Sequence, residues 1–100
     1  MHIKYFVDAL DNEEAISKVK ESLSAFNEIT IKIDSVESYY KFENVYMIEL
    51  TTDIEQDMLS IIFDLYSDSW ISFDNEYLAS KTNPDCKYMR NGFEMIQIYV

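Results

Sequence analysis

Glycine and proline are almost absent from this chain of 100 residues, which has one of each. Disordered chains and linkers are rich in both, so the sequence predicts a folded chain. A single glycine also excludes the glycine-rich loops that cradle phosphate groups. With 48% hydrophobic residues, the chain can bury a core of its own, and we expect a single domain over residues 1–100.

Cysteine and histidine are equally scarce, with one residue each. Cys86 has no partner for an internal disulfide, so we expect a reducing, cytoplasmic setting. One Cys and one His cannot form a zinc site of the usual spacing. His2 stands beside the chain end, which is a poor place for the fixed geometry that nucleophilic catalysis needs. We therefore expect no catalytic residue, no metal and no cofactor.

Basic residues are missing from the centre of the chain. Between Glu43 and Ser80 there are nine carboxylates and no Lys or Arg, so this window holds most of the net charge of −11. Such a charge argues against direct binding to nucleic acid or to an anionic membrane. Solubility is the simplest reason for acidic residues, but it favours charges of both signs, interspersed. The one-signed pattern therefore favours a binding surface for a basic protein.

Aromatic residues, at 15% of the chain, mix with the acids in the stretch Asp64–Tyr77. Aromatic side chains supply affinity at protein interfaces, while charge speeds the encounter. We predict Trp70 to be at least half buried, because Trp is highly buried on average. The predicted partner-binding residues are Glu55, Asp57, Asp64, Tyr66, Asp68, Asp74, Glu76, Tyr77 and Tyr39.

Hydrophobic periodicity predicts the order β-α-β-β-α-β. Asp11 is a good N-cap for a helix over about residues 12–27. Thr52, with Glu55 three residues later, has the pattern of a capping box for a second helix that runs to about Tyr66. The apolar stripe that this helix is expected to bury consists of Ile54, Met58, Ile61, Ile62 and Leu65. Alternating apolar residues predict strands at 3–10, 29–40, 45–51, 70–73 and 93–100.

Asn91-Gly92 is the strongest short hairpin signal, because both residues accept positive φ. It predicts a terminal hairpin between Cys86–Arg90 and Phe93–Val100. The whole pattern predicts an α+β fold, a ferredoxin-like βαββαβ sandwich with an antiparallel sheet and an extra C-terminal β-hairpin.

The chain resembles the immunity proteins that bacteria make against polymorphic and contact-dependent growth inhibition toxins. The resemblance is one of format, carried by the single acidic domain, the stretch DLYSDSWISFDNEY (Asp64–Tyr77), Tyr39-Tyr40 and the lack of a catalytic constellation. It implies a stoichiometric inhibitor that binds a cognate basic toxin domain, often a nuclease, at its active site or at an exosite. We expect such a protein to be a monomer or a weak dimer.

Two alternatives of function stay open, beside a structural oligomer formed by pairing of sheet edges. One is a nucleic-acid-mimicking regulator of a host enzyme, which would use the same charge but bind several DNA-binding proteins. The other is a small ferredoxin-like ligand-binding or enzyme domain, which would need a deep pocket with converging carboxylates of perturbed pKa.

Overall fold

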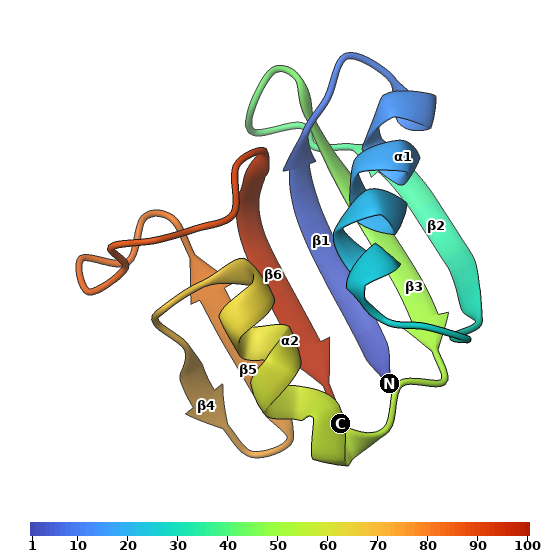
Figure 1. Cartoon of the computed structure of the whole chain (residues 1–100). Helices are drawn as coiled ribbons and strands as arrows, with labels where there is room; N and C mark the ends of the chain where they lie inside the picture. The colour runs from blue at the N-terminus through green and yellow to red at the C-terminus, as the bar shows by residue number, and fades with distance from the viewer.

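The computed structural model describes all residues, 1–100. Six strands and two α-helices follow one another along the chain, with a short 3₁₀ helix after the first α-helix and another before the second (Figure 1). In chain order the elements are β1 (His2–Asp8), α1 (Asn12–Ser22), η1 (Leu23–Ala25), β2 (Ile31–Ser38), β3 (Val45–Thr52), η2 (Gln56–Met58), α2 (Leu59–Tyr66), β4 (Ile71–Phe73), β5 (Glu76–Ser80) and β6 (Phe93–Tyr99).

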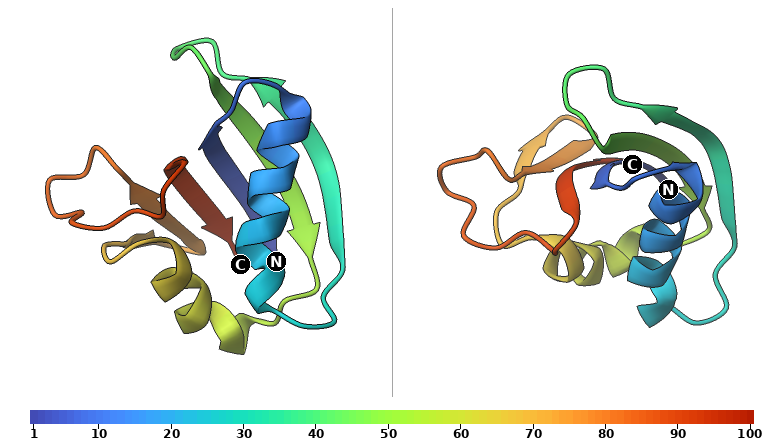
Figure 2. Two further views of the ribbon diagram at one scale, coloured as in Figure 1. Left: turned by 45° about the horizontal axis from the view of Figure 1, so that its top comes forward. Right: turned by 90° about the horizontal axis from the view of Figure 1, so that it is seen from above.

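The strands form one sheet in the order β2-β3-β1-β6-β5-β4, and every neighbouring pair is antiparallel. Both α-helices lie on the same face of this sheet, and no helix covers the other face (Figure 2). The predicted α+β class is therefore confirmed. The strand order differs from that of a simple ferredoxin fold, because β4 and β5 extend the sheet beyond β6.

The first strand and the first helix agree closely with the sequence prediction. Ile3, Tyr5 and Val7 of β1 face the helices and are fully buried. Asp11 is the N-cap of α1, and its carboxylate accepts a hydrogen bond of 2.8 Å from the backbone N–H of Glu14. The α-helix ends earlier than predicted and continues only as the single turn η1.

The predicted capping box at Thr52 is wrong. Thr52 is the last residue of β3, where its N–H donates to the carbonyl of Met1 at 2.9 Å. The chain then stays extended, so that Ile54 is buried in the core, and α2 begins only at Leu59, without a side-chain cap. The sheet contact at Thr52 and the burial of Ile54 together outweigh the local capping preference.

The predicted strand at Cys86–Arg90 is also wrong. The extra hairpin is β4–β5, which lies before this segment, and β5 pairs with β6. Residues 86–90 instead run beside the end of α2, where Met89 forms an isolated bridge with Ser67 and the Arg90 N–H donates to the Tyr66 carbonyl at 2.7 Å. The turn at Asn91-Gly92 is confirmed, and Gly92 has φ +92°.

The core lies between the sheet and the two helices and contains one buried polar cluster. The hydroxyl groups of Tyr5 and Tyr66 are 2.9 Å apart, and the Ser22 hydroxyl lies 2.6 Å from that of Tyr66. Both tyrosines are fully buried. Burial raises the pKa of Tyr66 to about 12 and that of Tyr5 well above its usual value. The cluster ties α1, α2 and β1 together and leaves no buried side-chain polar atom without a partner.

Candidate functional site

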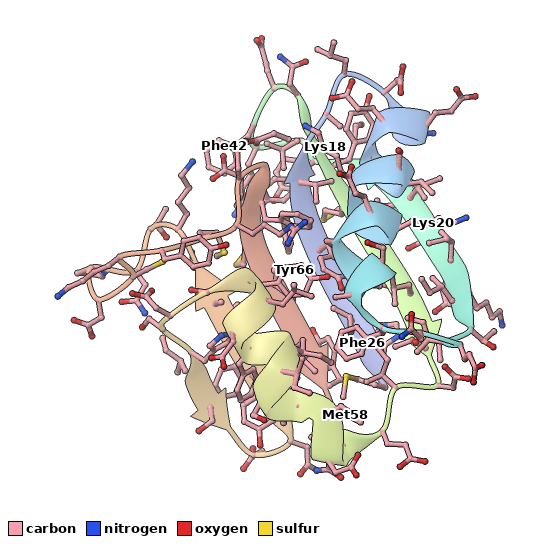
Figure 3. All side chains as sticks on the ribbon, in the orientation of Figure 1. Lys18, Lys20, Phe26, Phe42, Met58 and Tyr66 are labelled. Carbon is pink, nitrogen blue, oxygen red and sulfur yellow. The ribbon has the colours of Figure 1, made fainter.

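A groove lies between the α1–β2 connection and the segment that leads from β3 into α2. It has a volume of about 390 Å³ and opens to solvent. Figure 3 shows Phe26 and Met58 at the same end of the molecule, one on each side of the groove. The residues that line it are Ala25, Phe26, Asn27, Glu28, Ile29, Asp53, Ile54, Glu55, Met58 and Ile61. We call these residues the acidic groove.

The two walls of the acidic groove are tied to each other at one point. The carboxylate of Asp53 accepts a hydrogen bond of 2.8 Å from the backbone N–H of Thr30. Next to this contact, Glu28 has φ +60°. A Glu residue in this left-handed conformation is strained, because its Cβ approaches the following carbonyl and its side chain offers no local compensation. Strained backbone of this kind persists where the surrounding structure holds it, and it clusters at functional sites.

Exposed apolar side chains form part of the groove. Met58 is 42% exposed and Ile61 is 50% exposed, although the sequence placed both on the buried face of the second helix. That expectation is wrong, because the helix begins at Leu59 and directs Ile62 and Tyr66 into the core. Met58 and Ile61 lie beside the half-buried Phe26 and Ile29, so the groove presents a local apolar patch, which is typical of interaction sites.

The carboxylates of the groove have no basic partner. Glu28, Asp53 and Glu55 line it, and no ion pair reaches any of them. The ion pairs of the molecule join Lys4 to Glu49, Lys18 to Glu14, Lys32 and His2 to Asp34, and Lys81 to Glu94. The groove is therefore an apolar surface bordered by uncompensated negative charge.

Three of the nine predicted binding residues lie at or beside the groove. Glu55 lines it, and Asp57 is exposed in the adjoining turn η2. Asp64 is exposed on α2, three residues after Ile61, and residues three apart are neighbours on a helix surface. These acids extend the negative field from the groove along α2.

The other acids of the prediction lie elsewhere. Asp68 is exposed, but its carboxylate accepts the backbone N–H groups of Lys87 and Tyr88, at 3.1 and 3.0 Å for one oxygen. The bonds from Tyr88 and Lys87 hold the pKa of Asp68 below its usual value. Asp74 forms the tight turn between β4 and β5, with φ +51°. Glu76 pairs across the sheet with Tyr99, and its charge, after burial, helps to raise the pKa of that tyrosine.

The predicted aromatic anchors also lie in different parts of the structure. Tyr66 is fully buried in the core, so the structure rules it out as an exposed anchor. Tyr77 is half buried against Phe63 of α2, with ring centroids 5.0 Å apart. Tyr39 packs against Phe6 on the face of the sheet that no helix covers. The nine residues therefore do not form one continuous surface.

Trp70 is half buried, as predicted. Its ring packs on Phe63 with centroids 4.7 Å apart, and its indole N–H donates to the carbonyls of Phe63 and Ser67. Trp70 thus packs the segment that leads into the β4–β5 hairpin against the end of α2.

Of the ten residues that line the groove, sequence reasoning named only Glu55 as a binding residue, and it missed those that give the groove the rest of its acidic and apolar character. Glu28 lies outside the base-free window, and Asp53 looked like the first residue of a helix. One signal was available for the apolar residues, because six of the eight residues of α2 are apolar. A helix with apolar residues on most sides needs other elements to cover most of its surface. Where such cover is missing, some of its apolar residues are exposed. The missed residues are Phe26, Glu28, Ile29, Asp53, Met58 and Ile61.

No three His, Cys, Asp or Glu side chains converge to hold a metal ion. Neither α-helix combines the length and the apolar character that crossing a membrane requires. Comparison with family models, with curated proteins and with solved structures gives no match.

Proposed function

We propose that this protein is a stoichiometric inhibitor that binds a cognate basic protein through the acidic groove. The sequence resembles bacterial immunity proteins in format. This resemblance favours, as the partner, a polymorphic or contact-dependent growth inhibition toxin domain such as a nuclease. The inhibitor acts by binding, without catalysis and without a cofactor, in the cytoplasm of the cell that makes it.

One observation carries this proposal: the groove combines exposed apolar side chains with carboxylates that no base neutralises. Apolar contact supplies affinity when water is excluded, and the carboxylates attract a partner rich in Lys and Arg. Carboxylates also occupy the positions that substrate phosphates take on a nuclease, so the same contacts block its substrate. Fully desolvated pairs of this kind slow dissociation.

We also infer that β1, α1, β2, β3, α2 and β6 correspond to a ferredoxin-like βαββαβ unit that carries β4–β5 as an insertion. The adjacency β2-β3-β1-β6 supports this correspondence. The inserted hairpin lies between α2 and β6 in the chain, away from the groove-lining residues.

Co-expression tests the proposed function. The chain is produced together with the C-terminal domain of the protein encoded immediately upstream, and growth and co-purification are followed. We expect a one-to-one complex that restores growth. A toxic neighbour that neither binds nor is neutralised contradicts the proposal, and so does capture of many unrelated DNA-binding proteins, which would indicate a nucleic-acid mimic.

A further inference from the structure

A second hollow lies on the face of the sheet that no helix covers. The connection between β2 and β3 arches over this face in Figure 2, and Phe42 lies at the end of the molecule opposite Met58 in Figure 3. The hollow has a volume of about 460 Å³. Its lining residues are Phe6, Asp8, Tyr39, Phe42, Glu43, Val45, Ser80, Thr82, Glu94 and Met95.

Aromatic rings form one wall of this hollow. Phe6 and Tyr39 meet edge to face with centroids 5.1 Å apart, and Tyr39 packs against Phe42 at 5.7 Å. Phe42 nevertheless stays 60% exposed, so one side of its ring is open to solvent. The rings pack on one another, and the Tyr39 N–H donates to the Val45 carbonyl at 2.7 Å, so this wall is formed before any ligand arrives, which reduces the entropy cost of binding.

Carboxylates also line this hollow and give it a negative charge. Asp8, Glu43 and Glu94 line it, and no Lys or Arg does. Burial first, and then the neighbouring Asp8, raise the pKa of Glu94. Lys81 reaches Glu94 only at 3.9 Å and is itself 60% exposed. Glu94 therefore has only this long, largely exposed ion pair, and the Lys18 Nζ near Asp8 donates to the Asp8 backbone carbonyl at 2.6 Å and pairs with Glu14.

We propose that this hollow receives the cationic side chain of a Lys or Arg residue presented by a basic protein segment. A cation over an aromatic face is attracted by the ring quadrupole, and the attraction grows when water is excluded. The Lys4 Nζ already lies 5.5 Å from the Phe6 centroid, so Phe42, which is 60% exposed, is the lining ring with a face open to an entering cation. The aliphatic part of the entering side chain would lie on Val45 and Met95, and its charge would reach Glu94 and Asp8.

This site is independent of the acidic groove. The two share no residue and lie at opposite ends of the molecule. A variant that loses one function should therefore keep the other.

Capped tripeptides test the proposal by NMR titration of the isotope-labelled protein. Glycyl-arginyl-glycine and glycyl-lysyl-glycine are the cationic probes, and the matched peptide with norleucine is the neutral probe. We expect saturable shifts confined to the hollow, with the cationic peptides binding about three- to tenfold more tightly than the neutral one. Equal binding of all three peptides, no binding, or shifts centred elsewhere would overturn the proposal.

Two exposed positions supply variants with matched controls. Phe42→Ala removes a ring of the wall, whereas Tyr40→Ala removes a neighbouring ring that is 85% exposed and does not line the hollow. Glu94→Gln removes a lining carboxylate, whereas Glu37→Gln removes an exposed carboxylate on β2. We expect the first of each pair to abolish the preference for cationic peptides and the second to keep it. Loss of the preference in a control, or its persistence in both lining variants, contradicts the site.

Discussion

Glu28 has a left-handed backbone conformation that is unfavourable for its side chain. Four residues have positive φ, and the other three are Asn44, Asp74 and Gly92. Asn, Asp and Gly adopt this conformation at little cost, but Glu does not. The Glu28 carboxylate lies on the wall of the acidic groove without a basic partner. Retaining Glu here makes sense if the negative charge serves the partner.

Replacing Glu28 separates stability from binding. Glu28→Asn should stabilise the fold by about 0.5–1 kcal/mol, because Asn tolerates positive φ, and should weaken partner binding. Glu28→Gln keeps the strain and removes the same charge, so it should weaken binding equally without stabilising the fold. Urea unfolding and an affinity measurement give both values. Unchanged affinity in both variants would remove Glu28 from the site.

Tyr66 is the residue where the sequence prediction and the structure disagree most. Its neighbours in the chain are acidic and aromatic, so the local sequence predicts an exposed anchor, but the helical turn directs it between Tyr5 and Ser22. The buried hydroxyl cluster cannot be read from sequence, because its three members are far apart in the chain.

Removing the Tyr66 hydroxyl tests the importance of that cluster. Tyr66→Phe leaves the buried Tyr5 hydroxyl without its hydrogen-bond partner, whereas Ser22 keeps its bond to the Val19 carbonyl. We expect a loss of about 1–3 kcal/mol in the free energy of unfolding, measured with urea. Tyr40→Phe, at an exposed position, is the matched control and should change stability little. Equal stability of the two variants would contradict the structural role of the cluster.

At the scale of elements, the segment 81–92 is held by few contacts. It has no regular structure, and its main attachments are the Asp68 carboxylate and the backbone contacts of residues 88–90 with the end of α2. Asp68, which was predicted to bind a partner, therefore attaches the segment 81–92 to the end of α2.

The pKa of Asp68 sets the pH dependence of this attachment. The carboxylate has a lowered pKa in the folded protein, so its stabilising bonds are fully present above the ordinary pKa of about 4 and are lost as the pH falls through the lower folded value. Hydrogen exchange should show protected amides at Lys87 and Tyr88 at neutral pH and less protection in acid. In Asp68→Asn, protection should be low at both pH values, whereas Asp64→Asn should behave like the wild type. Equal protection in Asp68→Asn and wild type would show that the carboxylate does not hold the segment.

Elements governed by local signals could be predicted, and those governed by tertiary contacts could not. Asp11 caps α1 as its sequence indicates, and β1 alternates as predicted. Thr52 and Cys86–Arg90 carry equally good local signals, but sheet pairing with Met1 and the docking of Met89 on Ser67 override them. Dependence on tertiary contacts also explains why the sequence did not reveal the whole groove. Sequence revealed the one-signed charge, but Met58 and Ile61 are exposed because α2 begins only at Leu59 and directs Ile62 and Tyr66 into the core.

The whole molecule has two faces of different chemistry. On the helix side, apolar residues and unpaired acids meet in the acidic groove. On the open face of the sheet, much of the charge is paired, as between Lys4 and Glu49 or Lys32 and Asp34, and the aromatic hollow lies at one end. Most of the net charge of −11 comes from the window 43–80, so long-range attraction of a basic partner is expected at low salt and is screened beyond about 8 Å at physiological ionic strength. Close contacts in the groove must then supply specificity.

Affinity for the partner, measured for two charge-reversed variants of equal net charge, tests the central claim most directly. Glu55→Lys with Asp57→Lys changes the groove and its border, and Glu13→Lys with Glu21→Lys changes two exposed, unpaired acids of α1. If the acidic groove binds the partner, the first variant should bind roughly ten- to a hundredfold more weakly and show a flatter salt dependence. The second should stay within about threefold of the wild type. Equal weakening in both variants would mean that net charge alone attracts the partner, and it would contradict binding at the groove.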